Sequence, residues 1–99
     1  MSTHKMIMVT YNEAIDVDVM EVLNGCGLVN YTKVTRVFGK GTASGTHLGN
    51  QIWPGLNYIS YVACDDEQAK QIVSGVTNLR KTLGKEGVKA FVMPLEQIT

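Results

Sequence analysis

Two glycine-rich segments of this chain also carry lysines, and both have the residue types that bind an anion. Residues 39–55 read GKGTASGTHLGNQIWPG and contain five of the ten glycines of the chain. Residues 83–89 read LGKEGVK. Glycine lets backbone N–H groups approach a phosphate or carboxylate, and lysine adds positive charge. Both segments are therefore candidates for ligand recognition; a mobile surface loop and an ordinary turn with solvated lysines are the alternative interpretations.

The first segment is long for a connection between two strands, and such connections are more often functional than short ones. A P-loop is excluded, because that motif requires a helix directly after its glycines and lysine. His47 is either a metal or anion ligand or a solvated loop histidine. Trp53, with Pro54 and Gly55, is expected to anchor the base of the loop, because the indole buries a large ring and proline fixes φ.

Charge and hydropathy exclude several classes of partner. Nine basic and nine acidic side chains cancel, and no basic run is present, which argues against binding to nucleic acid or to an anionic membrane surface. No apolar run approaches the roughly 20 residues that span a bilayer, so we expect no membrane insertion. The first residues do not resemble a signal peptide, and a cytoplasmic location is the resulting expectation.

Residues that could carry catalysis or bind a structural metal are few. Cys26 and Cys64 are expected to be buried thiols, with a disulfide as the alternative, and they do not form a zinc-binding pattern. The carboxylates near the first predicted helix, among them Asp16, are interpreted as a solvated face. Nothing in the sequence indicates a Ser–His–Asp or Cys–His arrangement. The sequence therefore predicts no catalytic residues.

The pattern of apolar residues predicts four strands and two helices in one domain, residues 1–99. Strands are expected over 5–11, 31–38, 56–64 and 88–95. The first helix is expected to be capped by Asp16 and to stop at Gly25. The second should run from Asp65 or Asp66 to about Thr82, with Asp65 and Gln68 as a capping box. The order β-α-β-β-α-β predicts an α+β, ferredoxin-like fold, with a four-stranded antiparallel sheet and both helices on one face.

The strands have apolar residues on both faces. Met6 and Met8 alternate with Ile7 and Val9 in the first strand, and the last strand has the same character. A sheet face without helices is normally polar in a monomer, and a large bare apolar face favours aggregation. The pattern therefore favours a homo-oligomer that buries this second face; irregular strand packing within a monomer is the alternative.

Three stretches, taken in order, resemble the PII-like signalling proteins, the superfamily of nitrogen regulatory protein PII. VTRVFGKG (34–41) resembles the strand end before the PII T-loop, and ACDDEQAKQIVSGV (63–76) resembles the following strand-to-helix turn. GKEGVKAFVMPLEQI (84–98) resembles the B-loop and the last strand. This resemblance covers nearly the whole chain and identifies it as a divergent member.

The resemblance implies a homotrimeric, non-enzymatic regulator that binds an adenine nucleotide in clefts between subunits. The segment 39–55 would be the T-loop that contacts a target protein, such as a membrane transporter or an enzyme. The implied ligand-binding residues lie at the loop base and in the B-loop: Phe38, Gly39, Lys40, Gly41, Gly84, Lys85, Gly87 and Lys89. The implied partner-binding residues of the loop are Thr42, Ser44, His47, Asn50 and Trp53.

Two departures from the family pattern leave the ligand open. Val88 stands where the family has a glycine, and no tyrosine lies in 39–55 for the tyrosine modification of some PII proteins. ATP, ADP, another adenine nucleotide and a metal ion all remain candidates. Two other classes remain as well. One is a CutA-like trimer with a metal-related role, in which His47 would be the only obvious loop ligand, and the other is a small ferredoxin-like-barrel enzyme such as a monooxygenase or isomerase.

Overall fold

A computed structural model describes residues 4–28, 30–38, 56–83 and 87–99. The described chain forms four strands, two α-helices and one 3-10 turn. In chain order these are β1 (His4–Asn12), η1 (Glu13–Ile15), α1 (Asp16–Gly25), β2 (Thr32–Phe38), β3 (Leu56–Asp65), α3 (Asp66–Leu83) and β4 (Val88–Pro94). The predicted elements are all present, and their ends agree with the sequence pattern within about two residues.

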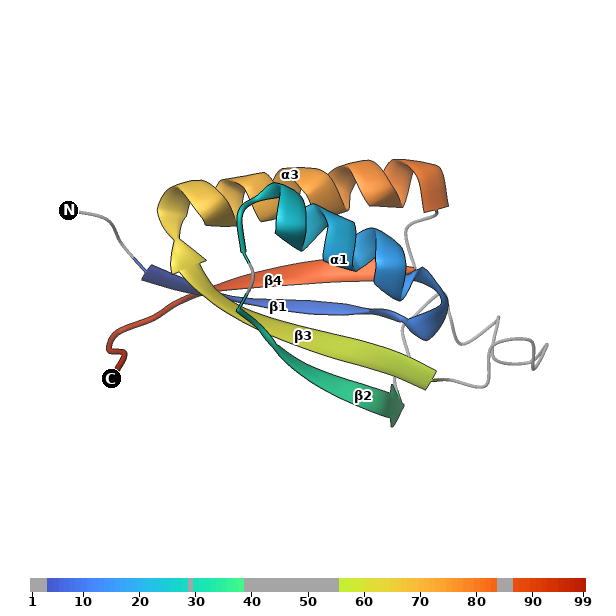
Figure 1. The fold of residues 1–99 in the computed structure, drawn as a ribbon, viewed down its shortest axis with the longest axis horizontal. Helices are drawn as coiled ribbons and strands as arrows, with labels where there is room; N and C mark the ends of the chain where they lie inside the picture. The colour runs from blue at the N-terminus through green and yellow to red at the C-terminus, as the bar shows by residue number, and fades with distance from the viewer. Residues whose placement is uncertain (1–3, 29, 39–55, 84–86) are drawn as a thin grey trace.

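The four strands form one antiparallel sheet in the order β2-β3-β1-β4. Strands β1 and β3 are central, while β2 and β4 are the two edges. Figure 1 shows α1 and α3 packed side by side on the same face of this sheet. The opposite face has no helix among the described residues (Figure 1). This is the split βαβ arrangement, and the predicted ferredoxin-like fold is confirmed.

The hydrophobic core lies between the sheet and the two helices. From the sheet, alternate residues of the central strands face the helices, because successive side chains of a strand point to opposite faces. From α1 and α3, residues three or four apart face the sheet. The most deeply buried of these side chains are Ile7, Val9, Val19, Leu23, Val62, Ile72 and Val88.

Helix α3 begins with the predicted capping box. The Gln68 backbone N–H donates to Asp65 Oδ1 over 2.7 Å, and the Asp65 N–H donates to Gln68 Oε1 over 3.1 Å. Each side chain satisfies a backbone donor that the first helical turn leaves without a partner. The start of this helix is therefore set by four consecutive residues.

The start of α1 differs from the prediction. The cap position is Ile15, which makes no side-chain cap hydrogen bond, and Asn12 instead caps the preceding 3-10 turn by accepting from the Ala14 N–H. Asp16 does not cap the helix; its carboxylate is bonded to side chains of two strands. The prediction of Asp16 as a helix cap was wrong because a helix-start pattern contains no information about where the sheet places the Tyr11 and Lys33 side chains.

The other end of α1 is a Schellman motif. The helix ends at Gly25, as predicted, and Gly27 takes the left-handed conformation with φ of 77°. The Leu28 N–H donates to the Leu23 carbonyl and the Gly27 N–H to the Asn24 carbonyl, each over 3.0 Å. These two bonds satisfy carbonyls at the helix end, and Leu28 is buried in the core beside them.

Candidate functional site

The sheet face opposite the helices is apolar over its middle, and polar residues such as Thr10 and its pair Lys89 lie on it toward one end. Met8 pairs with Tyr61 on one side and with Phe91 on the other, and Met6 pairs with Ala63 and Met93. Directly paired residues of antiparallel strands lie on the same face. Phe91 is 41% exposed and Met93 37% exposed in the single chain. The predicted apolar character of this second face, which we call the open face, is confirmed.

A β-bulge in β2 adds to the open face. The register of β2 against β3 shifts between Val34 and Val37, so that Val34 pairs with Ile59 and Val37 with Asn57. Residues 34 and 37 would point to opposite faces of a regular strand, but the extra residue brings both to the open face. Arg36 lies in the bulge with φ of 59°, the one non-glycine residue of the described chain in the left-handed region.

The predicted ligand-binding residues that the structure describes lie at one end of the sheet but at opposite edges. Phe38 ends β2, pairs with Leu56 and is 83% exposed. Gly87 and Lys89 lie at the start of β4, beyond β3 and β1. With neighbouring strands about 4.8 Å apart, the two edges are separated by about 14 Å. Within the described chain, therefore, Phe38 does not meet Gly87 or Lys89.

The remaining predicted site residues lie outside the described residues. For the ligand site these are Gly39, Lys40, Gly41, Gly84 and Lys85. For the partner loop they are Thr42, Ser44, His47, Asn50 and Trp53. Among the described residues, no group of three or more His, Cys, Asp or Glu side chains is arranged to hold a metal ion.

The start of β4 is held from two directions. The Asn12 N–H, at the end of β1, donates to the Gly87 carbonyl over 3.1 Å. Arg80 Nη1, in the last turn of α3, donates to the Val88 carbonyl over 2.8 Å. Val88 itself is only 1% exposed and pairs with Tyr11. Lys89 is the next residue along the chain and is exposed, so its charged group projects from a fixed backbone.

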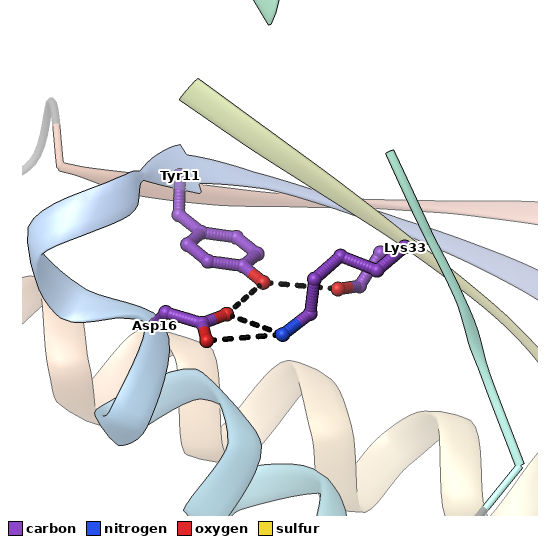
Figure 2. A network of polar contacts seen from close by, with 4 residues as sticks. Tyr11, Asp16 and Lys33 are labelled. Atoms are coloured by element: carbon purple, nitrogen blue, oxygen red, sulfur yellow. Dashed lines mark hydrogen bonds and ion pairs between the residues drawn. The ribbon is translucent and has the colours of Figure 1, made fainter. Parts of the chain in front are cut away.

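A polar network joins three strands to the start of α1, and sequence reasoning did not find it (Figure 2). The Tyr11 hydroxyl donates to Asp16 Oδ1 over 2.6 Å and lies 3.0 Å from Ser60 Oγ. A phenol has one proton, which goes to the carboxylate, so the Ser60 hydroxyl donates to Tyr11. Lys33 Nζ lies 2.9 Å from Asp16 Oδ1 and 3.0 Å from Oδ2. The interpretation of Asp16 as part of a solvated face was therefore wrong.

Aromatic rings complete the surroundings of Lys33. Its Nζ lies 5.6 Å from the ring centroids of both Tyr31 and Tyr58, within the range of a cation–π contact. The Lys33 and Asp16 side chains are only 21% and 26% exposed. This ion pair is thus partly screened from water and fixes the edge strand β2 to α1.

The groups of the described core that could act as nucleophiles are held in their protonated forms. Burial raises the pKa of the Tyr11 phenol well above its ordinary value of 10.0, and the hydrogen bond to Asp16 raises it further. Burial also raises the pKa of the Cys26 and Cys64 thiols. Both cysteines are free, as predicted; Cys64 is buried as expected, whereas Cys26 is only half-buried. Thiols with a raised pKa are poor nucleophiles, since the thiolate is the reactive form.

A shallow apolar groove between α3 and β4 is separate from this region. Lys5, Asp66, Val73 and Val92 are among the residues that line it. It lies where β1 begins and β4 ends, which is the end of the sheet opposite Phe38 and Gly87. The groove is therefore not the predicted ligand site.

The family model of nitrogen regulatory protein P-II matches residues 4–99. The chain belongs to the P-II family. This match covers every described element and favours P-II over the CutA-like and barrel-enzyme alternatives. No curated protein sequence is significantly similar to the chain.

Solved structures of PII-like proteins have the same fold. CPII from Thiomonas intermedia K12, bound to ADP, AMP and acetate, superposes with a TM-score of 0.72 at 15% identity, over 100% of this chain and 93% of that one. The apo form of CPII gives a TM-score of 0.71 at 15% identity, over 93% and 88%. A putative PII-like signalling protein from Thermus thermophilus gives 0.67 at 17% identity, over 95% and 88%. At these identities the likeness establishes the fold.

The predicted ligand residues Phe38, Gly87 and Lys89 lie at the end of the sheet where β2 ends and β4 begins. Membership of the P-II family makes this end the candidate ligand site. The described helices do not include one long and apolar enough to cross a membrane. The cytoplasmic location, the single domain and the trimer stay predictions.

Proposed function

We propose that this P-II protein is a homotrimeric, non-enzymatic regulator that binds an adenine nucleotide between subunits and acts on a target protein through residues 39–55. The observation that carries the proposal is the family match over residues 4–99. P-II is named as a regulatory family, and CPII, a PII-like neighbour in structure, was solved with ADP and AMP.

The open face supports an assembly. Each side chain of the size of Met8, Phe91 or Tyr61 gains roughly 1.5–3 kcal/mol when it is fully removed from water. A continuous apolar sheet face of this kind marks an interaction surface in a stable protein. Three copies that bury their open faces around a common axis would remove it from solvent. The trimer is chosen over other closed assemblies because of the family resemblance.

The separation of the two edges supports a ligand site shared between subunits. Phe38 lies on the β2 edge, and Gly39, Lys40 and Gly41 follow it in the sequence. Of the second group, Gly87 and Lys89 lie at the β4 edge, and Gly84 and Lys85 precede them in the sequence. In a closed ring, the β2 edge of one copy can approach the β4 edge of the next. Lysines and glycine N–H groups from both would then surround the phosphates of the nucleotide.

The state of the ionisable groups in the core supports a regulatory role. The Tyr11 and cysteine protons are held by burial, and Asp16 is already paired with Lys33. These groups serve the fold, whereas the predicted partner residues Thr42, Ser44, His47, Asn50 and Trp53 belong to a segment between two strands. We propose that this segment contacts the target, either a transporter or an enzyme, in the cytoplasm.

Two measurements on the purified native chain test the proposal. Light scattering should give three times the mass of one chain. Calorimetry should show binding of at least one of ATP, ADP and AMP, and bicarbonate and divalent metal ions complete the panel of ligands. A stable monomer would overturn the assembly. A trimer that binds none of the three nucleotides would show that the proposed ligand is wrong, without contradicting the fold or the assembly.

A further inference from the structure

Arg80 is the one charged side chain of the described residues that hydrogen-bonds the backbone of β4. It lies in the last turn of α3, where it is half-buried, and its Nη1 is 2.8 Å from the Val88 carbonyl oxygen. Lys81, the next residue, is exposed. A hydrogen bond from a charged donor is about twice as strong as one between neutral groups. The contact therefore fixes the first residue of β4 against α3.

This contact acts on the residues that flank Val88. The Gly87 carbonyl is held by the Asn12 N–H at 3.1 Å, and the Val88 side chain is buried against the core. With Arg80 on the Val88 carbonyl, the backbone that presents Lys89 is restrained from β1 and from α3. A charged group binds an anion with less loss of entropy when its backbone is already fixed.

We propose that Arg80 is a positioning residue for the anion site of the β4 edge, where it acts through Val88 on Gly87 and Lys89. This inference rests on the proposed nucleotide site. The resemblance places a glycine at the position of Val88. In this chain, the buried Val88 side chain fixes the strand to the core, and Arg80 fixes it through the Val88 carbonyl. The guanidinium suits the role because it stays charged at any physiological pH and donates in a fixed plane.

The test compares Arg80→Met with Arg80→Lys, with Lys81→Met as the matched control on the same helical turn and Lys89→Ala as the variant that removes the anion-binding charge. Two quantities are measured: amide hydrogen exchange of residues 87–90 without ligand, and ADP affinity by calorimetry. We expect Arg80→Met to speed exchange at 87–90 and to weaken ADP binding on the order of tenfold, because the backbone that carries Lys89 must then be ordered when the ligand binds. Arg80→Lys should recover part of both effects, and Lys81→Met should change neither.

Lys89→Ala should weaken ADP binding without changing exchange, because it removes charge and leaves the backbone held. If Arg80→Met weakens binding at unchanged exchange rates, Arg80 is a direct ligand and the positioning role is overturned. Native exchange and native affinity in Arg80→Met would overturn it too. If the native chain binds ATP or AMP but not ADP, affinity is measured with the nucleotide that binds. If it binds none of the three, the proposed nucleotide is wrong, and the exchange rates of Arg80→Met alone decide whether Arg80 holds the start of β4.

Discussion

Lys33 and Asp16, 17 residues apart in sequence, form a two-pronged ion pair: Lys33 Nζ lies 2.9 Å from Asp16 Oδ1 and 3.0 Å from Asp16 Oδ2. Lys33 belongs to the edge strand β2, which has a neighbouring strand only on its β3 side, and Asp16 opens α1. Surface ion pairs contribute little to stability, but this one is largely shielded from water and shares its carboxylate with Tyr11 (Figure 2). The pair therefore adds a side-chain anchor to a strand that the sheet holds on one side only.

Replacing Lys33 by methionine should lower the free energy of unfolding by about 1.5–3 kcal/mol, the range for a hydrogen bond to a charged group. Methionine keeps most of the apolar stem and leaves the Asp16 carboxylate without its cation. Urea unfolding measures the change, and exchange of the β2 amides should rise more than exchange of the β1 amides. Lys81→Met, an exposed control, should have native stability. Equal loss for both variants would contradict the anchoring role.

Tyr11 should make stability fall at alkaline pH. Its pKa in the folded protein is raised above the unfolded value of about 10, mainly by burial. The sign follows from proton binding: above pH 10 the unfolded chain loses this proton and the folded chain keeps it, so unfolding is favoured by about 1.4 kcal/mol for each further pH unit. The contribution is complete below pH 10 and is lost as pH rises toward the folded pKa.

Urea titrations of the native chain and of Tyr11→Phe between pH 8 and 11 isolate this effect. At pH 8 the variant should be about 1 kcal/mol less stable, because the hydrogen bonds to Asp16 and Ser60 are lost. Toward pH 11 the difference should shrink, since phenylalanine has no proton to lose. All other residues are the same in the two proteins, so the comparison isolates Tyr11. A difference that stays constant across this range would show that Tyr11 keeps an ordinary pKa.

Local sequence patterns predicted the elements of this fold well. The alternation in residues 5–11 indicates a strand with two apolar faces, and Asp65 with Gln68 marks the start of α3 three residues apart. These features depend on neighbours in the chain, so a single sequence contains them. The family resemblance rested on similar short stretches and on their order, and the match to the P-II model over residues 4–99 confirms it.

Contacts between distant residues could not be predicted in the same way. Asp16 looked like a helix cap, because acidic residues at helix starts usually are. Its real partners are Tyr11, on β1, and Lys33, which the register of β2 on β3 places opposite Ser60 and near Asp16. The same holds for Arg80 and the Val88 carbonyl. Each contact forms only when the sheet is assembled, and no spacing of residue types in the sequence indicates it.

At Gly75, too, the tertiary structure determines the effect of a substitution on stability. A glycine inside a helix normally costs about 1 kcal/mol against alanine, so the sequence alone would make Gly75→Ala stabilising. In the structure a Cβ at this position would lie 2.6 Å from Val22 Cγ1, where α1 crosses α3. Gly75→Ala should therefore destabilise the protein by about 1–3 kcal/mol, the usual cost of overpacking, in spite of the better helix propensity.

Thermal unfolding of three variants tests the crossing. Adding Val22→Ala to Gly75→Ala should recover part of the loss, because it removes the atoms that collide. Asn78→Ala, at an exposed position of the same helix, should be neutral or slightly stabilising. If Gly75→Ala also stabilised the protein, the two helices would have room to move apart and the close approach would carry no cost.

Met8 lies in the middle of the open face, between Tyr61 on β3 and Phe91 on β4, and it is the position where a charge should do most damage to an assembly. A buried carboxylate without a partner costs several kcal/mol, and in a closed trimer the cost recurs in every copy. Met8→Asp should therefore convert the proposed trimer to monomers, as measured by light scattering. The far-ultraviolet circular dichroism should stay close to native, because Met8 points away from the core between sheet and helices.

Two further variants control for the effect of adding a charge elsewhere. Glu67→Lys, on the exposed side of α3, should leave the mass unchanged. Val92 pairs with Ile7 and so lies on the other face, and Val92→Asp should leave more of the trimer intact than Met8→Asp. If Met8→Asp retained the native mass, the open face would not be the interface, and the surface that joins the copies would have to be sought at the β2 and β4 edges.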